Sequence, residues 1–400
     1  MKLVAPRLDR ISASPTLAIR MASARLKAEG RDILRVSSGE PDFDTPQHIK
    51  DAAIAAIQAG ATKYTDVGGT RALRQAVAEK FHRENGIAYS EDEVIVATGG
   101  KQVIFNALLA TIDDGEEAII PSPCWVSYPD IVKLAGGVPV ILPCTAENGF
   151  KLSPAALEAA ITAKTKWLIL NNPCNPTGAV YSLDELRALA AVVLRHPDIW
   201  VFTDDIYEKL VFDGAEPATI VQAEPRLRER TITMNGCSKS YAMTGWRIGY
   251  AGAPAELIEA MEKLQGQSTS NTSSVSQAAA LAALSGPQDA IAMMRDAYAR
   301  RRDMVAELLA NTPGLRCHSP QGAFYLFPDI SACLGRRSAG GTELATDTDF
   351  VAALLAEQGV AVVPGSAFLG AGHFRLSFAA EDAALREAAL RIQRFCAGLR

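Results

Sequence analysis

Short apolar runs alternate with longer helical patterns through the middle of this chain, and this alternation constrains its fold most strongly. The runs are continuous and rich in β-branched residues, as expected of strands buried on both faces. The expected strands are 93–97, 117–120, 138–142, 167–171, 199–203, 231–234 and 247–251, and helices such as 101–112, 124–135 and 182–196 lie between them. This order predicts an α/β fold, with a mostly parallel seven-stranded sheet covered by helices, over roughly residues 50–290.

The parts of the chain outside this core are expected to form a smaller lobe. A helix over about 16–29 and a strand over 33–36 precede the core, and a long helix over 288–310 follows it. The remaining segment, about 312–400, contains strand-like runs and two helical patterns. We therefore predict a large domain of residues 49–290, a small α+β domain built from 13–48 and 291–400, and an N-terminal arm of residues 1–12. The length agrees, because single cores rarely grow beyond about 250–300 residues.

Composition and charge argue against several classes of partner. The formal net charge is −5 and no Lys/Arg-rich run occurs, so neither nucleic acid nor an anionic membrane is expected as a partner. No apolar stretch approaches the roughly 18 residues of a membrane span, and no signal peptide is recognisable. The seven cysteines lack C-x-x-C spacing and the five histidines are scattered. We expect buried thiols, no metal site, and a cytoplasmic location.

Two Gly- or Pro-rich motifs follow expected strands. T-G-G-K-Q (98–102) opens a helix, where free backbone N–H groups and the helix dipole favour a phosphate. Taken alone, the same pattern is more often a plain tight turn. N-P-C-N-P-T-G (172–178) lies at the carboxyl end of a strand, where open α/β sheets build ligand sites. A purely structural turn remains the alternative reading of this motif.

Two further motifs carry groups suited to covalent chemistry. Asp204 and Tyr207 follow one strand, and on that segment alone a helix cap by Asp204 is the favoured interpretation. Lys239 lies among small residues after the next strand, with Arg247 eight positions later. A lysine in confined surroundings has a lowered pKa and suits covalent catalysis, although an isolated lysine is more often a solvated surface residue.

Taken together, the motifs resemble the class I pyridoxal-phosphate-dependent aminotransferases of fold type I, and within them the bacterial aspartate aminotransferase subgroup (aspartate/prephenate aminotransferase-like). Nine motifs match in order over essentially the full chain. They are S-S-G-E-P-D-F-D-T-P (37–46), T-K-Y-T (62–65), G-G-K-Q (99–102), W-V-S-Y-P (125–129), N-P-x-N-P-T-G (172–178), D-D-I-Y (204–207), S-K-S-Y-A-M-T-G-W-R-I-G-Y (238–250), G-A-F-Y (322–325) and F-R-L-S (374–377).

The resemblance implies a site for pyridoxal 5′-phosphate. Lys239 would bind the cofactor covalently and act as the base that moves the substrate's Cα proton. Asp204 would pair with the pyridine nitrogen, and Tyr207 and Asn175 would hydrogen-bond the ring's 3′ oxygen. Trp125 would stack on the ring. Cis peptide bonds are implied before Pro123 and Pro176.

The resemblance also implies how the cofactor's phosphate is held. The expected contacts are backbone N–H groups and side chains of Gly99, Gly100, Lys101, Ser238 and Arg247, with Tyr64 from the neighbouring subunit of a homodimer that shares its active sites. Many relatives carry Ser or Thr three residues before the lysine, where this chain has Gly236. One phosphate contact is therefore expected to be missing.

The substrates implied are an amino acid and a 2-oxo acid that bind in turn. Arg375 would fork the α-carboxylate, assisted by Asn175, the backbone of Gly39 and the nearby Trp125. Lys101 would pair with the distal carboxylate, and Ser14 and Thr16 would line that end of the pocket. The expected reaction moves the amino group of L-aspartate to 2-oxoglutarate by a ping-pong mechanism, giving oxaloacetate and L-glutamate.

Two departures leave the amino donor open. Ser12 stands where prephenate-using relatives carry a basic residue, which lowers the expectation of prephenate activity, and Cys124 replaces a tyrosine. An aminotransferase for aromatic, neutral or prephenate-type substrates therefore stays an alternative.

The fold also supports lyase and decarboxylase chemistry. A non-catalytic regulator is disfavoured, because every catalytic position holds a competent residue and no room is left for a fused DNA-binding domain.

Overall fold

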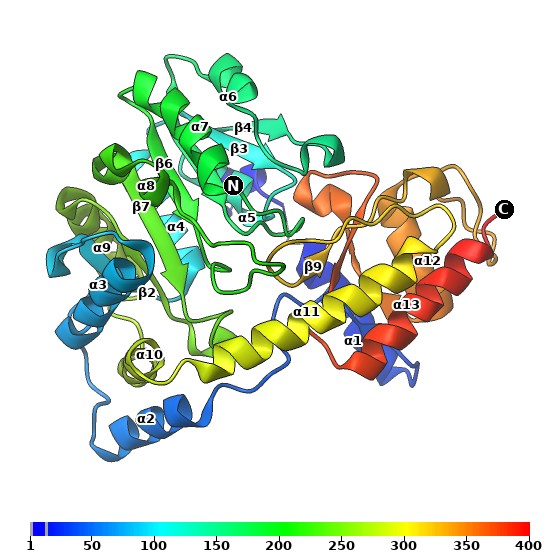
Figure 1. Cartoon of the computed structure of the whole chain (residues 1–400), viewed down its shortest axis with the longest axis horizontal. Coiled ribbons are helices and arrows are strands. Elements are labelled where there is room, and N and C mark those ends of the chain that lie inside the picture. Colours follow the sequence, from blue (N-terminus) through cyan, green and yellow to red (C-terminus); the bar gives the residue numbers. More distant parts are fainter. Residues whose placement is uncertain (1–2, 13–14) are drawn as a thin grey trace.

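The computed structural model describes residues 3–12 and 15–400 and contains the expected seven-stranded sheet (Figure 1). Its strand order is β2-β8-β7-β6-β5-β3-β4. The strands are β2 (Val94–Ala97), β3 (Glu117–Ser122), β4 (Val138–Pro143), β5 (Thr165–Asn171), β6 (Trp200–Asp204), β7 (Thr231–Gly236) and β8 (Gly249–Gly252). Only β8 runs antiparallel to its neighbours, so the prediction of a mostly parallel sheet is confirmed.

Helices cover both faces of this sheet. Along β2, Val94 and Val96 enter one hydrophobic core, whereas Ile95 and Ala97 enter the other. One face packs against α4 (Gly100–Thr111), α5 (Ser127–Leu134) and α9 (Ala255–Ser268). The other face carries α3 (Arg71–Asn85), α6 (Pro154–Ala160), α7 (Leu183–Arg195), α8 (Ile220–Ala223) and α10 (Ser274–Ser285), and α2 (Gln47–Gln58) packs against α10. Burial on both faces explains why the strands are apolar throughout.

A second, smaller unit combines the N- and C-terminal parts of the chain. Figure 1 shows the long helix α11 (Asp289–Ala310) running from α10 to α12 (Asp347–Gln358) and α13 (Asp382–Ala397). An antiparallel sheet has the order β11 (Val363–Pro364), β12 (Phe374–Ser377) and β9 (Tyr325–Leu326). After α1 (Pro15–Ala28), β1 (Leu34–Arg35) pairs with β10 (Val360–Ala361). A strand of the N-terminal part of the chain therefore pairs directly with a strand of the C-terminal part.

Short 3-10 helices connect these elements. They are η1 (Pro6–Arg10), η2 (Glu91–Glu93), η3 (Ala146–Asn148), η4 (Pro225–Arg230), η5 (Thr244–Trp246), η6 (Ser331–Cys333) and η7 (Gly365–Phe368). Across the described residues, no helix combines the length and apolarity that crossing a bilayer would require.

Two predicted elements were placed wrongly, and both changes matter for the cavity. The helix expected over 124–135 begins only at Ser127, and the Cys124 N–H donates outside that helix to the carbonyl of Phe368 (2.9 Å). The strand expected over 247–251 begins at Gly249, and Arg247 adopts a left-handed φ of 58°. Tertiary contacts override local pattern at both positions.

Within residues 3–12 and 15–400, three X-Pro peptide bonds are cis. The bonds before Pro123 and Pro176 are cis, as the resemblance implied. The bond between Asn172 and Pro173 is cis as well, which the sequence reading did not anticipate.

Candidate active site

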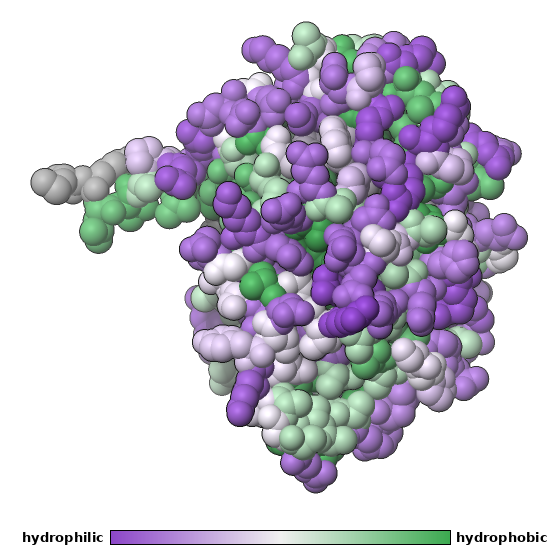
Figure 2. All heavy atoms as spheres, turned by 90° about the vertical axis from the view of Figure 1, so that its left-hand side faces the viewer, coloured by the Kyte–Doolittle hydropathy of each residue, from purple (hydrophilic) through white to green (hydrophobic). Residues whose placement is uncertain are grey.

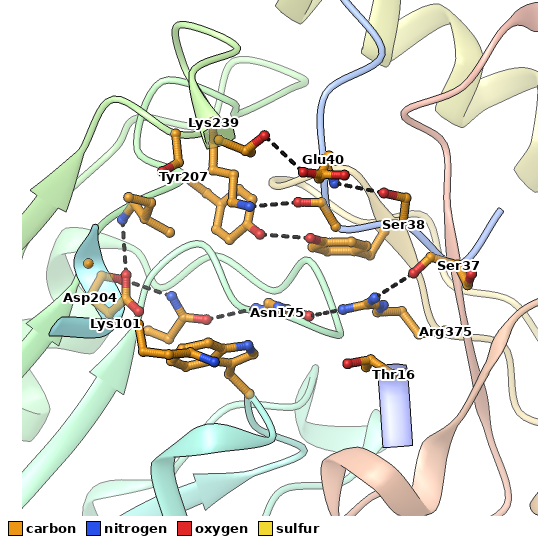
Figure 3. A pocket seen from close by; sticks show the side chains of 18 of the residues that line it. Thr16, Ser37, Ser38, Glu40, Lys101, Asn175, Asp204, Tyr207, Lys239 and Arg375 are labelled. Atoms are coloured by element: carbon orange, nitrogen blue, oxygen red, sulfur yellow. Dashed lines mark hydrogen bonds between the residues drawn. The ribbon is translucent and has the colours of Figure 1, made fainter. Parts of the chain in front are cut away.

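The expected site residues meet at the carboxyl edge of the large sheet. Lys239 follows β7, Asp204 ends β6, Asn175 follows β5 and Trp125 follows β3. They line one cavity of about 830 Å³, near the upper end of the range usual for ligand pockets. Other expected residues that line it are Thr16, Gly39, Gly100, Lys101, Tyr207, Ser238, Arg247 and Arg375. Figure 3 shows most of these side chains pointing toward one space.

Two expected residues that the structure describes do not line this cavity. Gly99 lies just behind it, against the Arg247 side chain. Tyr64 is 90% exposed in the single chain. Ser14 lies outside the described residues.

Lys239 projects its amine across the cavity from the large sheet to the N-terminal segment. Its Nζ donates to the carbonyl oxygen of Gly39 (2.6 Å), 200 residues away in the sequence (Figure 3). Burial, together with the positive charge of Arg375, lowers the pKa of Lys239 to about 8. A larger fraction of this amine is therefore uncharged and nucleophilic near neutral pH than for an ordinary lysine.

This lowered pKa predicts the pH dependence of labelling in the cofactor-free protein. Because only the neutral amine reacts, acetylation of Lys239 should rise with pH through about 8, rather than through 10.5. Peptide mass spectrometry after brief exposure to acetic anhydride between pH 6 and 11 measures this profile. Lys164, an exposed lysine, is the internal reference. If both lysines followed one profile, the lowered pKa would be refuted.

Asp204 is buried and faces the cavity from the end of β6. Its Oδ2 accepts a hydrogen bond from the Tyr128 hydroxyl (2.6 Å), and its Oδ1 accepts one from the Ile206 N–H (3.2 Å). Burial raises the pKa of Asp204 to about 6, whereas the bond from Tyr128 favours the charged form. A cationic partner in the cavity would stabilise this carboxylate.

Arg375 is only 4% exposed and is held on two sides (Figure 3). Its Nη1 donates to Oδ1 of Asn175 (2.9 Å) and its Nη2 to the carbonyl of Ser37 (2.9 Å). The ring of Tyr325 lies 4.4 Å from the Arg375 Cζ. Its Nε has no hydrogen-bond partner within the described chain. A buried, oriented guanidinium with a spare donor is suited to bind a carboxylate.

Glycines make room where Arg247 meets the start of α4. Gly99 has a φ of 85°, and a Cβ there would lie 2.1 Å from Nη2 of Arg247. The Arg247 Nη1 donates to the carbonyl of Thr244 (3.0 Å), which orients the guanidinium. The departure at Gly236 also has a packing reason. A Cβ at this position would lie 2.9 Å from both Ile206 Cδ1 and the carbonyl oxygen of Ile248.

Lys101 lies against the aromatic wall of the cavity. Its Nζ is 4.9 Å from the centroid of the Trp125 ring, and burial lowers the pKa of Lys101, as does the charge of Arg247. Figure 3 shows Thr16, at the start of α1, on the Arg375 side of the cavity. The cations Lys101 and Arg375 therefore both line this cavity, each beside an aromatic ring.

Sequence reasoning missed two tyrosines of the site. Tyr128 bonds Asp204, and the Tyr325 hydroxyl lies 2.7 Å from the Tyr207 hydroxyl. Both lie within recognised motifs, W-V-S-Y-P and G-A-F-Y, but nothing in the local pattern indicates their partners. Asn171 was also missed, and its Oδ1 accepts from the Asn175 N–H (2.8 Å).

The cavity residues fit a pyridine aldehyde that carries a phosphate. The fit rests on the amine of lowered pKa, the buried carboxylate of Asp204 opposite it, and the Gly99–Gly100 turn beside Arg247, where a side chain would clash. Among the described residues, no group of three or more His, Cys, Asp and Glu side chains could hold a metal ion. The seven-stranded sheet and this set of groups are those of the pyridoxal-phosphate-dependent enzymes of fold type I.

The comparisons with known proteins identify the family. Residues 31–392 match the family described as aminotransferase class I and II, and the chain belongs to this family, which uses pyridoxal phosphate. It is 54% identical over 399 residues to the aspartate/prephenate aminotransferase of Cereibacter sphaeroides, with 100% of both chains covered.

Solved structures agree over the full length. The crystal structure of the aspartate aminotransferase from Rhizobium meliloti superposes with a TM-score of 0.97 at 50% identity, covering 100% of both chains. The aspartate aminotransferase from Thermus thermophilus with maleate gives a TM-score of 0.92 at 42% identity, covering 99% of this chain and 100% of that one.

Proposed function

We propose that this chain is an aspartate aminotransferase that moves the amino group of L-aspartate to 2-oxoglutarate in a ping-pong cycle. The observation that carries the proposal is the pair of cationic groups, Arg375 and Lys101, that line one cavity with the Lys239 amine. A four-carbon dicarboxylate has two anionic ends that such an arrangement can bind at once. The relatives named aspartate aminotransferase support the same substrate.

Pyridoxal 5′-phosphate is the proposed cofactor. When bound, it supplies an aldehyde that exchanges with amino groups and a ring that withdraws electrons from the substrate Cα. Lys239 would hold it covalently, Asp204 would pair with its ring nitrogen, and Tyr207 and Asn175 would bond its 3′ oxygen. Trp125 would lie against the ring. The Gly99–Lys101 turn, Ser238 and Arg247 would bind the phosphate at the N-terminus of α4.

The chain's own groups would then act on the substrate. The Arg375 guanidinium would bind the α-carboxylate with Asn175 and the backbone of Gly39, which orients the Cα–H bond toward Lys239. The Lys239 Nζ would take the Cα proton and return a proton in the second half of the cycle. Lys101 and Thr16 would hold the distal carboxylate. Burial of Arg375 strengthens its pairing with the α-carboxylate.

Lys101→Ser should change the choice of amino donor. Losing a charge-assisted bond at the distal carboxylate is expected to lower kcat/KM for aspartate roughly 10- to 100-fold. The value for alanine, which lacks that carboxylate, should change little. Initial rates of glutamate formation from 2-oxoglutarate with each donor measure the ratio. An unchanged aspartate-to-alanine ratio would contradict the proposed role of Lys101.

The same donor panel tests the proposed function as a whole. The unaltered protein should form oxaloacetate and glutamate in equal amounts, and only when 2-oxoglutarate is present. Release of a 2-oxo acid without an acceptor would instead indicate a lyase. Preference for aromatic or neutral donors over aspartate would favour the alternative aminotransferase. Absence of turnover with every donor would contradict an enzymatic role.

A homodimer with shared active sites is part of the proposal. Tyr64 is 90% exposed, and Ile54 and Ile57 on α2 are also exposed. Figure 2 shows hydrophobic side chains along the N-terminal arm that projects from the body, where Leu3 and Val4 are exposed. Such apolar surface is typical of protein interfaces. Sedimentation equilibrium should give twice the mass of the 42.6 kDa chain, and a monomer at micromolar concentration would contradict the dimer.

A further inference from the structure

The cavity contains more positive charge than the proposed reaction uses. Its cationic lining residues are Arg20, Arg35, Lys101, Lys239, Arg247 and Arg375, and its carboxylates are Glu40 and Asp204. The chain as a whole has a net charge of −5, so this excess is local. Four of the six cations have roles in the proposed chemistry. Arg20 and Arg35 have none.

The two unassigned arginines come from neighbouring elements of the smaller unit. Arg20 lies one helical turn after Thr16 on α1, and Arg35 ends β1. Both elements adjoin β10, because α1 contacts β10 and β1 pairs with it. Both arginines are exposed although they line the cavity, so they lie where it opens to solvent.

Neither guanidinium has a partner among the residues that the structure describes. Arg20 and Arg35 form no hydrogen bond or ion pair with any residue that the structure describes. Other arginines nearby are engaged. Arg25, also on α1, pairs with Glu29, and Arg391 pairs with Asp32. Two unpaired guanidinium groups at the opening of a cavity are free to bind an anion, and their planar forks match a carboxylate.

We propose that Arg20 and Arg35 form a second anion subsite for the distal carboxylate of substrates longer or bulkier than aspartate. This inference rests on the proposed function, because it assumes that Arg375 anchors the α-carboxylate. With that end fixed, a short dicarboxylate reaches Lys101 beside Trp125, whereas a longer frame can extend to the arginines of α1 and β1. The volume of about 830 Å³ leaves space for such a frame, and Leu17, which also lines the cavity, offers it an apolar contact.

General electrostatic attraction is the competing explanation. Two exposed cations at an opening raise the local concentration of every anionic substrate, whatever its length. In that case, removing the two charges would lower kcat/KM by the same factor for aspartate and for longer dicarboxylates. A subsite acts only on a substrate whose second carboxylate reaches it. The length dependence of the effect therefore separates the two explanations.

The test compares donors of different length in the cofactor-loaded enzyme. The variants are Arg20→Gln, Arg35→Gln and the double variant, with Arg25→Gln as a matched control that removes the same charge from the same helix outside the cavity. The donors are aspartate, 2-aminoadipate and norleucine, the last being a neutral donor with a six-carbon chain like that of 2-aminoadipate.

The double variant should lower kcat/KM for 2-aminoadipate roughly tenfold, about threefold for each arginine, as expected for partly exposed charge pairs. The values for aspartate and norleucine should fall much less. Arg25→Gln should resemble the unaltered protein, and Arg20→Lys should recover part of the loss because it restores the charge. Equal losses for aspartate and 2-aminoadipate, or no loss for either, would overturn the subsite.

A binding measurement makes the result independent of turnover. Titration calorimetry with adipate and succinate, which cannot react, should show weaker adipate binding in the double variant by about the same factor, with succinate little affected. Unchanged adipate binding, or none in the unaltered protein, would overturn the subsite.

If the unaltered enzyme fails to transaminate aspartate, the proposed function fails instead. Normal aspartate turnover with no length-dependent loss would refute only the subsite.

Discussion

Lys239→Ala should abolish transamination, with kcat falling roughly 10⁴-fold or more. The variant loses both the covalent attachment point and the base, and no second lysine can replace it, because Lys101 lies at the Trp125 wall. Stopped assays with aspartate and 2-oxoglutarate measure the loss. The purified variant should also lack a covalently held cofactor, seen as the absence of a borohydride-fixed mass on the peptide that contains residue 239.

Two controls make this result specific. Lys239→Arg retains a positive charge of similar reach but cannot attach the cofactor, so it should be as inactive as Lys239→Ala. Lys209→Ala, which removes a lysine paired with Glu84 outside the cavity, should keep its activity. A fixed cofactor mass that persists in Lys239→Ala would refute the assignment of the attachment point.

Arg375→Gln should cause the next largest loss, with kcat/KM falling roughly 100- to 1,000-fold for every amino donor. The guanidinium is buried and already oriented by Asn175 and Ser37. Its removal therefore leaves the substrate's α-carboxylate without a desolvated partner of opposite charge. Because every amino acid has an α-carboxylate, kcat/KM should fall by about the same factor for aspartate and for alanine. Initial rates with both donors measure this.

The donor pattern distinguishes this variant from Lys101→Ser, which should affect aspartate far more than alanine. Arg316→Gln is the matched control, since Arg316 is an exposed arginine of the smaller unit that pairs with Asp329 outside the cavity. A loss confined to aspartate in Arg375→Gln would mean that Arg375 binds the distal carboxylate instead. Such a result would reverse the proposed orientation of the substrate.

Local patterns were sufficient for the large sheet. Its strands are apolar on both faces because helices cover both faces, and this requirement is visible along a single strand such as Val94–Ala97. The pattern failed where distant segments act on the backbone. Cys124 lies outside the expected helix, and its N–H donates to the carbonyl of Phe368. Phe368 lies 244 residues further along the chain, so the local sequence around Cys124 does not indicate this contact.

The site shows the same division. Lys239, Asp204 and Arg375 could be named from motifs, because their chemical types and their neighbours in the sequence are diagnostic together. Their partners could not be named. Tyr128 bonds Asp204 across 76 residues, and the Tyr325 hydroxyl lies beside that of Tyr207 across 118. These contacts depend on how helices and loops pack, which no window of sequence contains.

The sequence by itself determined the family, the order of strands and helices, and the residue types that the chemistry needs, because these depend on local composition and spacing. Only the tertiary structure decided the pKa values and the orientations of the side chains in the site. Burial lowers the pKa of Lys239 to about 8, and Ser37, 338 residues before Arg375, helps to orient its guanidinium. It also placed Arg20 and Arg35 at the opening of the cavity, since charge density in a pocket arises only when separate elements converge.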